Sequence, residues 1–342
     1  MPVLAHREWG PPDPGPSVLP GVPDPHLSGV PDPHLPGVPD PHLPGVPDPD
    51  LPGPGAPERE GSPTRREGRG AVHRPLGPET LGPETLGPKT VGPETLGRRP
   101  LAVLVHGVTS SSRTWWRVGP ALAERGYRVV AVDLRGHGSS PRTAAGLSLA
   151  DLAGEVAETV EAVTQAASVD LVVGHSLGAL VALELVGRRP GFARRLVVED
   201  PPGSSSIDWA ALAAGIEADT HRAGTDPGAL RRDLEAANPA WPPGEAERRV
   251  ADLADCDGQA IAAAVRPGVP FDLPALLAAA RLPVLLLLAE EALGSNLCGL
   301  DRKAAVEALS DGTTRVLATG HSIHREALDA WLAALDDWLA SG

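Results

Sequence analysis

The chain has 342 residues, and its acidic side chains outnumber its basic ones to give a formal net charge of −14. This charge argues against nucleic acid or an anionic membrane surface as a partner, since neither attracts an acidic protein. Only two cysteines are present, Cys256 and Cys298, too few for a disulfide framework and wrongly arranged for a zinc site. We expect neither a cofactor nor a metal.

Residues 1–97 hold most of the prolines and almost no apolar run. An eight-residue unit occurs four times from Gly21, and a five-residue unit occurs four times from Leu76. Frequent proline removes backbone donors, and the glycines between leave too little apolar surface to offset the entropy of ordering. We therefore expect 1–97 to be a disordered tail, in which the recurring histidines are copies of the repeat rather than metal ligands.

No targeting segment is recognisable in the sequence. The N-terminus lacks a basic region followed by an apolar run of about 7 to 15 residues. The longest apolar run, residues 284–289, is too short to cross a bilayer. We expect a cytoplasmic protein.

From residue 98 onward, apolar runs alternate with helical patterns, which predicts a parallel sheet covered by helices on both faces. The runs predict six strands, at 101–106, 128–132, 169–173, 195–199, 283–288 and 314–318. Helices are predicted near 114–125, 148–166, 177–188, 302–310 and 324–340. Residues 98–342 are enough for one well-buried core.

The segment 201–282 interrupts this alternation. It contains no good strand, and it has helical periodicity around 209–218, 228–237 and 245–254. We expect a helical cap inserted between two strands. Trp209, Trp241 and Phe271 in this segment suggest a mostly apolar pocket for a small or medium acyl substrate.

A sharp strand-to-helix turn is predicted where the run Leu171–Val173 leads into Gly-His-Ser-Leu-Gly. The apex, Ser176, must take strained backbone angles, and the chain approaches itself at Gly174 and Gly178, where only small side chains fit. Such a turn places the Ser176 hydroxyl above the carboxyl ends of the strands, beside the unpaired Leu177 N–H. A glycine-rich turn can also serve packing alone, so the flanking motifs decide.

His106-Gly107 closes the first predicted strand. A glycine there lets the chain bend so that a backbone N–H, that of Val108, faces Ser176. Together with the Leu177 N–H it would supply two donors to a developing oxyanion, each typically worth about 3 kcal/mol of barrier.

A base is expected after the last strand, where Gly-His-Ser places His321 on a loop ahead of the C-terminal helix. From there it can reach over the sheet edge and accept the Ser176 proton. His324 is expected to be exposed or to cap the helix. We expect structural roles for His137, which lies in a glycine-rich loop, and for His175, which points the other way at the turn.

The carboxylate that orients His321 is open between several residues. Glu290 is the first choice and Glu291 the second, because both follow the strand 283–288 and preserve the order Ser, acid, His. Asp200 or Glu199, at the end of the strand 195–199, is a competitor.

Together these motifs resemble the α/β-hydrolase fold superfamily over residues 98–342. The resemblance rests on His106-Gly107, the D-x-R-G-H-G-x stretch from Asp133, the G-H-S-L-G turn and the Gly320-His321-Ser322 loop, in the order of that family. It implies Ser176 as nucleophile, His321 as base, an acid after the penultimate strand, and an oxyanion hole from Val108 and Leu177.

The sequence departs from the family pattern in two places. Many members carry an aspartate about three residues after a glycine at the end of the penultimate strand, where this chain has Ala289 and Ala292. Members also begin with two strands ahead of the His-Gly loop, and the Pro-Gly repeats of 70–97 cannot supply central strands. We therefore predict a sheet without the N-terminal hairpin, with 128–132 at its edge.

The expected activity is hydrolysis of an ester-like bond, in a carboxylic ester, thioester or lactone, through an acyl-enzyme on Ser176. An aspartate at the apex would have indicated halide or epoxide chemistry. Two alternatives stay open: a catalytically silent binding protein with this fold, and an acyltransferase or perhydrolase that uses the same triad. The oligomeric state is not assigned.

Overall fold

The computed structural model describes residues 3–10, 98–142, 148–205, 207–309 and 312–341. The predicted tail therefore lies outside the described residues from 11 to 97. Residues 3–10 belong to the same compact unit as residues 98 onward.

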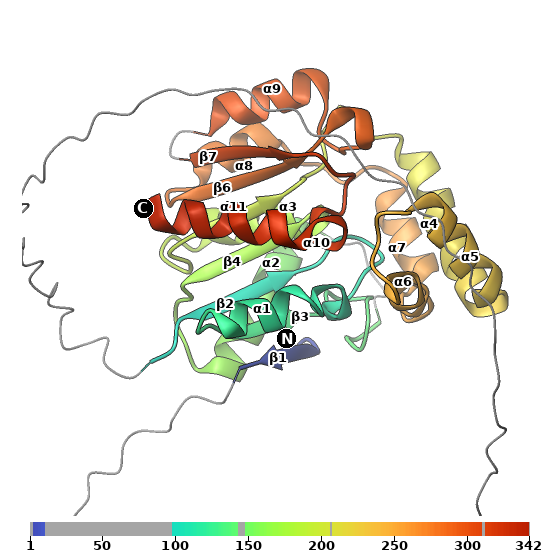
Figure 1. The fold of residues 1–342 in the computed structure, drawn as a ribbon, viewed down its shortest axis with the longest axis horizontal. Coiled ribbons are helices and arrows are strands. Elements are labelled where there is room, and N and C mark those ends of the chain that lie inside the picture. Colours follow the sequence, from blue (N-terminus) through green and yellow to red (C-terminus); the bar gives the residue numbers. More distant parts are fainter. Residues whose placement is uncertain (1–2, 11–97, 143–147, 206, 310–311, 342) are drawn as a thin grey trace, which may run out of the picture. The chain divides into compact units, whose positions relative to one another are not determined.

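A sheet of seven strands, in the order β1-β3-β2-β4-β5-β6-β7, forms the centre of the described chain (Figure 1). The strands from β2 to β7 run parallel to their neighbours, and β1 is antiparallel to β3. Every residue of β2, β4 and β6 is buried, as expected for strands covered on both faces. The bounds are β1 His6–Trp9, β2 Leu101–Val105, β3 Arg128–Val132, β4 Leu171–His175, β5 Leu196–Glu199, β6 Val284–Ala289 and β7 Gly312–Leu317. The mostly parallel sheet is confirmed, with one strand more than the six predicted.

The additional strand, β1, corrects the prediction that residues before 98 contribute nothing to the sheet and that 128–132 is an edge. β1 pairs with β3 from His6 opposite Val132 to Trp9 opposite Val129. Leu4, just before it, is 2% exposed, and the backbone N–H of Asp133 donates to the carbonyl of Ala5. The prediction was wrong because four residues ahead of a long Pro-Gly stretch give too short a pattern to recognise as a strand.

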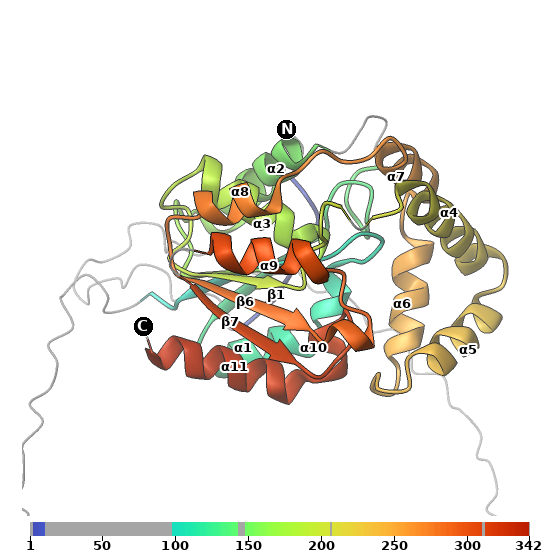
Figure 2. The ribbon, with the colours of Figure 1, turned by 90° about the horizontal axis from the view of Figure 1, so that it is seen from above.

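Helices cover both faces of the sheet (Figure 2). Along β2, Ala102 and Leu104 pack on one side, whereas Val103 and Val105 pack on the other. The first side carries α1 Val118–Glu124, α10 Ile323–Glu326 and α11 Leu328–Ser341; the second carries α2 Leu149–Thr164, α3 Leu177–Arg188, α8 Leu273–Ala279 and α9 Gly299–Ala308. Short 3-10 helices occur at η2 Ser112–Trp115 and η3 Glu291–Leu293. None of the described helices is both long and apolar enough to cross a membrane.

Between β5 and β6 the chain forms helices that lie beyond the carboxyl ends of the strands (Figures 1 and 2). They are α4 Trp209–Thr225, α5 Pro227–Ala237, α6 Glu245–Ala254 and α7 Gly258–Val265. Aspartate side chains cap the N-termini of α4, α5 and α7, because each accepts a hydrogen bond from a backbone N–H in the first turn. The expected cap segment 201–282 also contains α8, but α8 packs against α3 and α9 in the layer on the sheet.

The docking of β1 can be tested at Leu4. We expect Leu4→Ala to lower the free energy of unfolding by about 2 to 4 kcal/mol, because it removes a buried side chain and leaves a cavity. Val3→Ala is the matched control, since Val3 is 50% exposed and its truncation should cost less than about 0.5 kcal/mol. Urea unfolding of both variants measures this. Equal, small losses would show that residues 3–10 add no buried packing.

Candidate active site

The turn from β4 into α3 gives Ser176 a strained backbone, with φ 55° and ψ −118°. A Cβ at Gly174 would collide with the carbonyl of Gly178, and a Cβ at Gly178 would collide with the carbonyl of Val105. Both positions therefore require glycine. The Ser176 N–H donates to the carbonyl of Glu199 at 3.0 Å, which ties the turn to the end of β5.

The backbone N–H groups of Val108 and Leu177, which the sequence predicted as oxyanion donors, lie near Ser176 and have no partner in the described part of the chain. Leu177 is the first residue of α3, where helix donors are unpaired. The loop that carries Val108 is close as well, because a Cβ built on Gly107 would lie 3.1 Å from the Cβ of Ser176. The two donors predicted for an oxyanion are thus available, and both residues line a cavity with Ser176.

His321 is oriented by Asp200, the competitor, and not by Glu290, the first choice. Its Nδ1 lies 2.7 Å from the Asp200 Oδ2. Asp200 is fully buried and accepts three further hydrogen bonds, from Ser295 Oγ and from the backbone N–H groups of Ala289 and Asn296. An ionised carboxylate only accepts hydrogen bonds, so the Nδ1 that faces Asp200 carries the hydrogen. The Nε2 of His321 is then left as the acceptor that a base requires.

The two glutamates favoured by the sequence lie elsewhere. The carboxylate of Glu291 accepts hydrogen bonds from the Gly299 N–H and from Arg302, which lower its pKa. Glu290 has no polar side-chain contact with His321 in the described part of the chain. The sequence analysis ranked Asp200 below the two glutamates, although Asp200 follows the buried strand β5 directly and preserves the order Ser, acid, His as well as Glu290 does.

In the structure, Nε2 of His321 lies 2.9 Å from Nδ2 of Asn296, which donates to it. No hydrogen bond joins His321 to the Ser176 hydroxyl among the residues described. Ser176, His321 and Asn296 nevertheless line one cavity. Hydrogen bonds of a catalytic base are often long or misaligned before substrate binds.

Two cavities of about 460 Å³ each meet at Ser176, and both also include Val108, Leu212 and Asn296 in their walls. The first, which we name the Trp209 cavity, is lined by apolar side chains of the cap such as Trp209 and Phe271. The second, which we name the Arg249 cavity, contains Trp241, Arg249, His321 and Arg325. Of the three aromatic residues from which the sequence suggested an apolar pocket, Trp209 and Phe271 line the first cavity and Trp241 lines the second, beside the two arginines.

Comparison with known proteins assigns the fold to a family. A model of the alpha/beta hydrolase family matches residues 102–335. The chain belongs to this family. Solved structures agree on the fold: a hydrolase from Pseudomonas aeruginosa has a TM-score of 0.59 at 23% identity, over 70% of this chain and 90% of that chain. An enol-lactonase from Burkholderia xenovorans has a TM-score of 0.58 at 19% identity, over 72% and 94%.

Curated relatives match this chain over shorter stretches. Epoxide hydrolase B of Mycobacterium tuberculosis is 42% identical over 85 residues, which is 24% of this chain and 23% of that protein. A pimeloyl-[acyl-carrier protein] methyl ester esterase of Methylococcus capsulatus is 37% identical over 132 residues, 36% of this chain and 49% of that protein. The chain thus spans less than half the length of these relatives.

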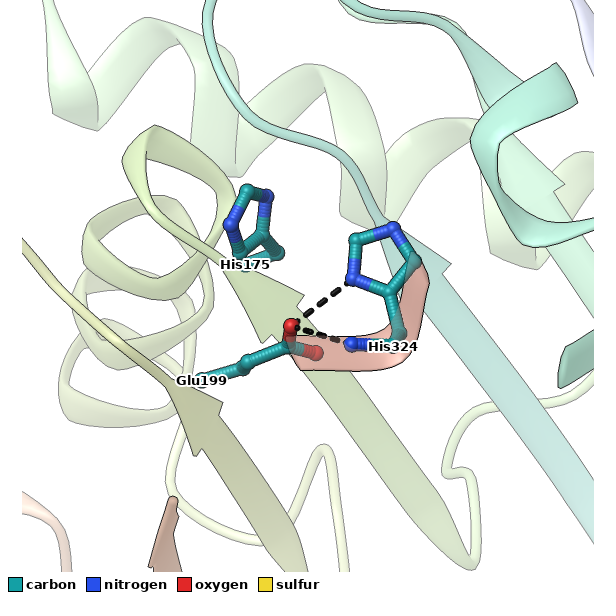
Figure 3. Close-up of side chains that lie close together, drawn as sticks. All are labelled: His175, Glu199 and His324. Atoms are coloured by element: carbon teal, nitrogen blue, oxygen red, sulfur yellow. Dashed lines mark hydrogen bonds and ion pairs between the residues drawn. The ribbon is translucent and has the colours of Figure 1, made fainter. Parts of the chain in front are cut away.

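A second acid–histidine pair lies beside the first. The expectation that His324 is exposed or caps the helix was wrong, because His324 is 2% exposed and Ser322 is the N-cap of α10. Glu199 Oε1 accepts from both the N–H and Nδ1 of His324, the latter at 2.7 Å (Figure 3). The other oxygen of Glu199 accepts from the Trp331 Nε1 at 3.0 Å. His175 completes the group, with its ring 4.6 Å from that of His321 and its Nε2 3.1 Å from the His321 carbonyl. The contacts of His175 with His321, and those of Glu199 with the neighbouring His324, therefore help to fix the loop that carries His321.

His175, Glu199 and His324 are also the residue types that bind metals, and their ligand atoms lie within 4.8 Å of one another. Both oxygens of Glu199 already accept hydrogen bonds, and the Nε2 of His324 lies 2.8 Å from the Thr114 hydroxyl. A metal ion would have to displace these partners. We therefore interpret the group as a hydrogen-bond network.

Burial holds the remaining histidines near the site in the uncharged form. It lowers the pKa of His106 and places that of His175 well below its ordinary value, where the neighbouring His321 and His324 add to the effect. It lowers the pKa of His137 to about 3, and the Nε2 of His137 has no partner in the described residues. His137 and His175 are thus buried, hydrogen-bonded neighbours of the site, and His175 also lines the Arg249 cavity with Ser176.

The buried His137 makes stability depend on pH. Between pH 6.5 and about 3 the unfolded chain takes up a proton here and the folded chain does not, so stability falls on acidification by about 1.4 kcal/mol per pH unit. His137→Asn keeps a donor for the Arg135 carbonyl but cannot titrate. From pH 6.5 to 5 it should lose about 2 kcal/mol less stability than the parent in urea unfolding.

The matched control for this measurement is His221→Asn, because His221 is exposed on α4. It should reproduce the pH slope of the parent. An unchanged slope in His137→Asn would show that His137 titrates in the folded protein much as it does in the unfolded chain.

Proposed function

We propose that the protein hydrolyses an ester-like bond, in a carboxylic ester, thioester or lactone, with Ser176 as the nucleophile. The observation that carries the proposal is the Nδ1 of His321 held 2.7 Å from the buried Asp200, with the acceptor Nε2 in the cavity that Ser176 also lines. The strained apex of Ser176 supports the same assignment, since strain of this kind concentrates at functional sites.

In the proposed reaction, Ser176 Oγ attacks the carbonyl carbon while His321 Nε2 takes the hydroxyl proton. The N–H groups of Val108 and Leu177 stabilise the oxyanion of the tetrahedral intermediate. His321 then gives its proton to the leaving oxygen or sulfur, which leaves an acyl group on Ser176. Water, deprotonated by His321, releases the acid and restores Ser176. An alcohol or peroxide in place of water would give the acyltransferase or perhydrolase alternatives.

The names of the relatives support ester-like bonds without fixing a substrate. One relative is named for a methyl ester and one structural neighbour for an enol lactone. Another relative is named for epoxides. The serine at the apex favours the former group, because it forms an acyl-enzyme with a carbonyl substrate.

A catalytically silent binding protein is the second candidate, and one observation favours it. Nε2 of His321 is engaged by Asn296 rather than by Ser176. Catalysis requires this nitrogen to leave Asn296 when substrate enters the cavity.

The proposal predicts that a fluorophosphonate labels Ser176. Intact mass after incubation should show one adduct on the parent chain and none on Ser176→Ala, because only an activated serine reacts at a useful rate. Ser205→Ala, on an exposed serine away from the turn, is the control and should keep the adduct. A folded parent without an adduct would favour the silent binding protein.

The orienting acid can be tested by its own pair of variants. Asp200→Asn should lower kcat on an ester substrate about a thousandfold or more, because an amide at this position no longer holds the hydrogen of His321 on Nδ1. Glu290→Gln makes the same chemical change at the position favoured by the sequence and should keep kcat within about twofold. The reverse result would return the orienting role to Glu290.

A further inference from the structure

The Arg249 cavity has a wall rich in hydrogen-bond donors. Its lining includes the guanidinium groups of Arg249 and Arg325, the indole of Trp241 and the amide of Asn296. Asp219 is the carboxylate among the described residues of this wall. Asp252 and, more weakly, Asp219 raise the pKa of Arg249, but burial and Arg325 lower it more strongly. The balance of groups therefore favours an acceptor or an anion as the occupant.

The two arginines differ in how their charge is compensated. Arg325 is buried and lies 3.1 Å from Glu245 and 3.9 Å from Asp252. Arg249 instead donates to the carbonyl and hydroxyl of Thr109, the latter at 2.8 Å, and has no ion pair within the described ranges. Burial and the nearby Arg325 lower the pKa of Arg249 to about 10, so it stays charged at neutral pH. Arg249 thus brings an unpaired positive charge to the cavity.

Trp241 adds an independent observation. Its Nε1 is buried and has no hydrogen-bond partner in the part of the chain that the structure describes. The Arg325 guanidinium lies over its ring at 5.3 Å from the centroid. A buried N–H without an acceptor is costly. Trp241 also lines the Arg249 cavity, so this unsatisfied donor belongs to a residue of the cavity wall.

We propose that the Arg249 cavity binds a carboxylate of the substrate, so that the scissile bond at Ser176 lies between an anionic end and an apolar end in the Trp209 cavity. Each terminal nitrogen of Arg249 keeps a second N–H beyond its bond to Thr109, and a hydrogen bond from a guanidinium to a carboxylate is strengthened by the opposite charges. The substrate class is then a half-ester of a dicarboxylic acid or a similar anionic ester. The hydrolytic step rests on the proposed function, whereas the carboxylate site does not.

The kinetic test compares esters that differ in one charge. In the first pair, monomethyl succinate carries a carboxylate on its acyl side and methyl butyrate is the neutral ester. In the second pair, acetoxyacetate carries a carboxylate on its alcohol side and propyl acetate is the neutral ester. In one of the two pairs we expect a higher kcat/KM for the anionic ester than for the neutral one. We expect Arg249→Met to lower the ratio of these two kcat/KM values about ten- to a hundredfold. Arg232→Met, on an exposed arginine of α5, should retain the ratio. Ratios that Arg249→Met leaves unchanged in both pairs would overturn the proposal.

A binding test separates this inference from the proposed function. Calorimetry on full-length Ser176→Ala should show binding of succinate but not of the uncharged succinamide, with affinity lost on adding Arg249→Met and kept on adding Arg232→Met. If Arg249→Met does not fold, succinate should still slow fluorophosphonate labelling of the parent more than succinamide does at equal ionic strength. Labelling of Ser176 with no effect of succinate in either assay would refute the carboxylate site alone. Succinate binding without labelling would refute the hydrolase proposal alone.

Discussion

Two consecutive buried carboxylates at the end of β5 fix the arrangement of the site. Glu199 and Asp200 are both fully buried, which is costly for charged groups unless every oxygen has donors. Asp200 accepts four hydrogen bonds and Glu199 accepts three. Neighbouring side chains at a strand end point to different sides, so one carboxylate takes His321 and the other takes His324. The end of β5 thereby holds the segment 321–324 at two residues, His321 and His324.

This constraint explains why the orienting acid lies after β5 rather than after β6. Asp200 receives donors from the end of β6, at Ala289, and from the turn at Ser295 and Asn296. Glu290 follows the strand where the family pattern places the acid, but among the described residues the Nδ1 of His321 faces Asp200. Asp200 itself has a positive φ of 37°, a strained conformation that its four hydrogen bonds help to maintain.

The sequence analysis predicted the features that depend on local sequence pattern. It missed features that depend on contacts between residues far apart in the chain. The parallel strands and the helix after Ser176 follow from apolar periodicity, and Gly174 and Gly178 follow from the sterics of one turn. β1 was missed because four residues pair across a separation of more than a hundred residues. The choice of acid and the burial of His324 depend on which side chains meet after the sheet has formed, and spacing along the chain carries little information about that.

One face of α6, in the cap, also could not be interpreted from the sequence pattern alone. Glu245, Arg249 and Asp252 recur at intervals of four and three residues, so they lie on one face of α6. Glu245 bonds the Trp116 indole and lies against Arg325, while Asp252 holds Ser111 and Arg113, so these two carboxylates anchor α6 to the loop after β2. Among the described residues, the hydrogen bonds of Arg249 to the same loop go to Thr109. Aromatic composition alone suggested an apolar pocket, yet the face that anchors the cap is charged, and its arginine is the group left to meet a ligand.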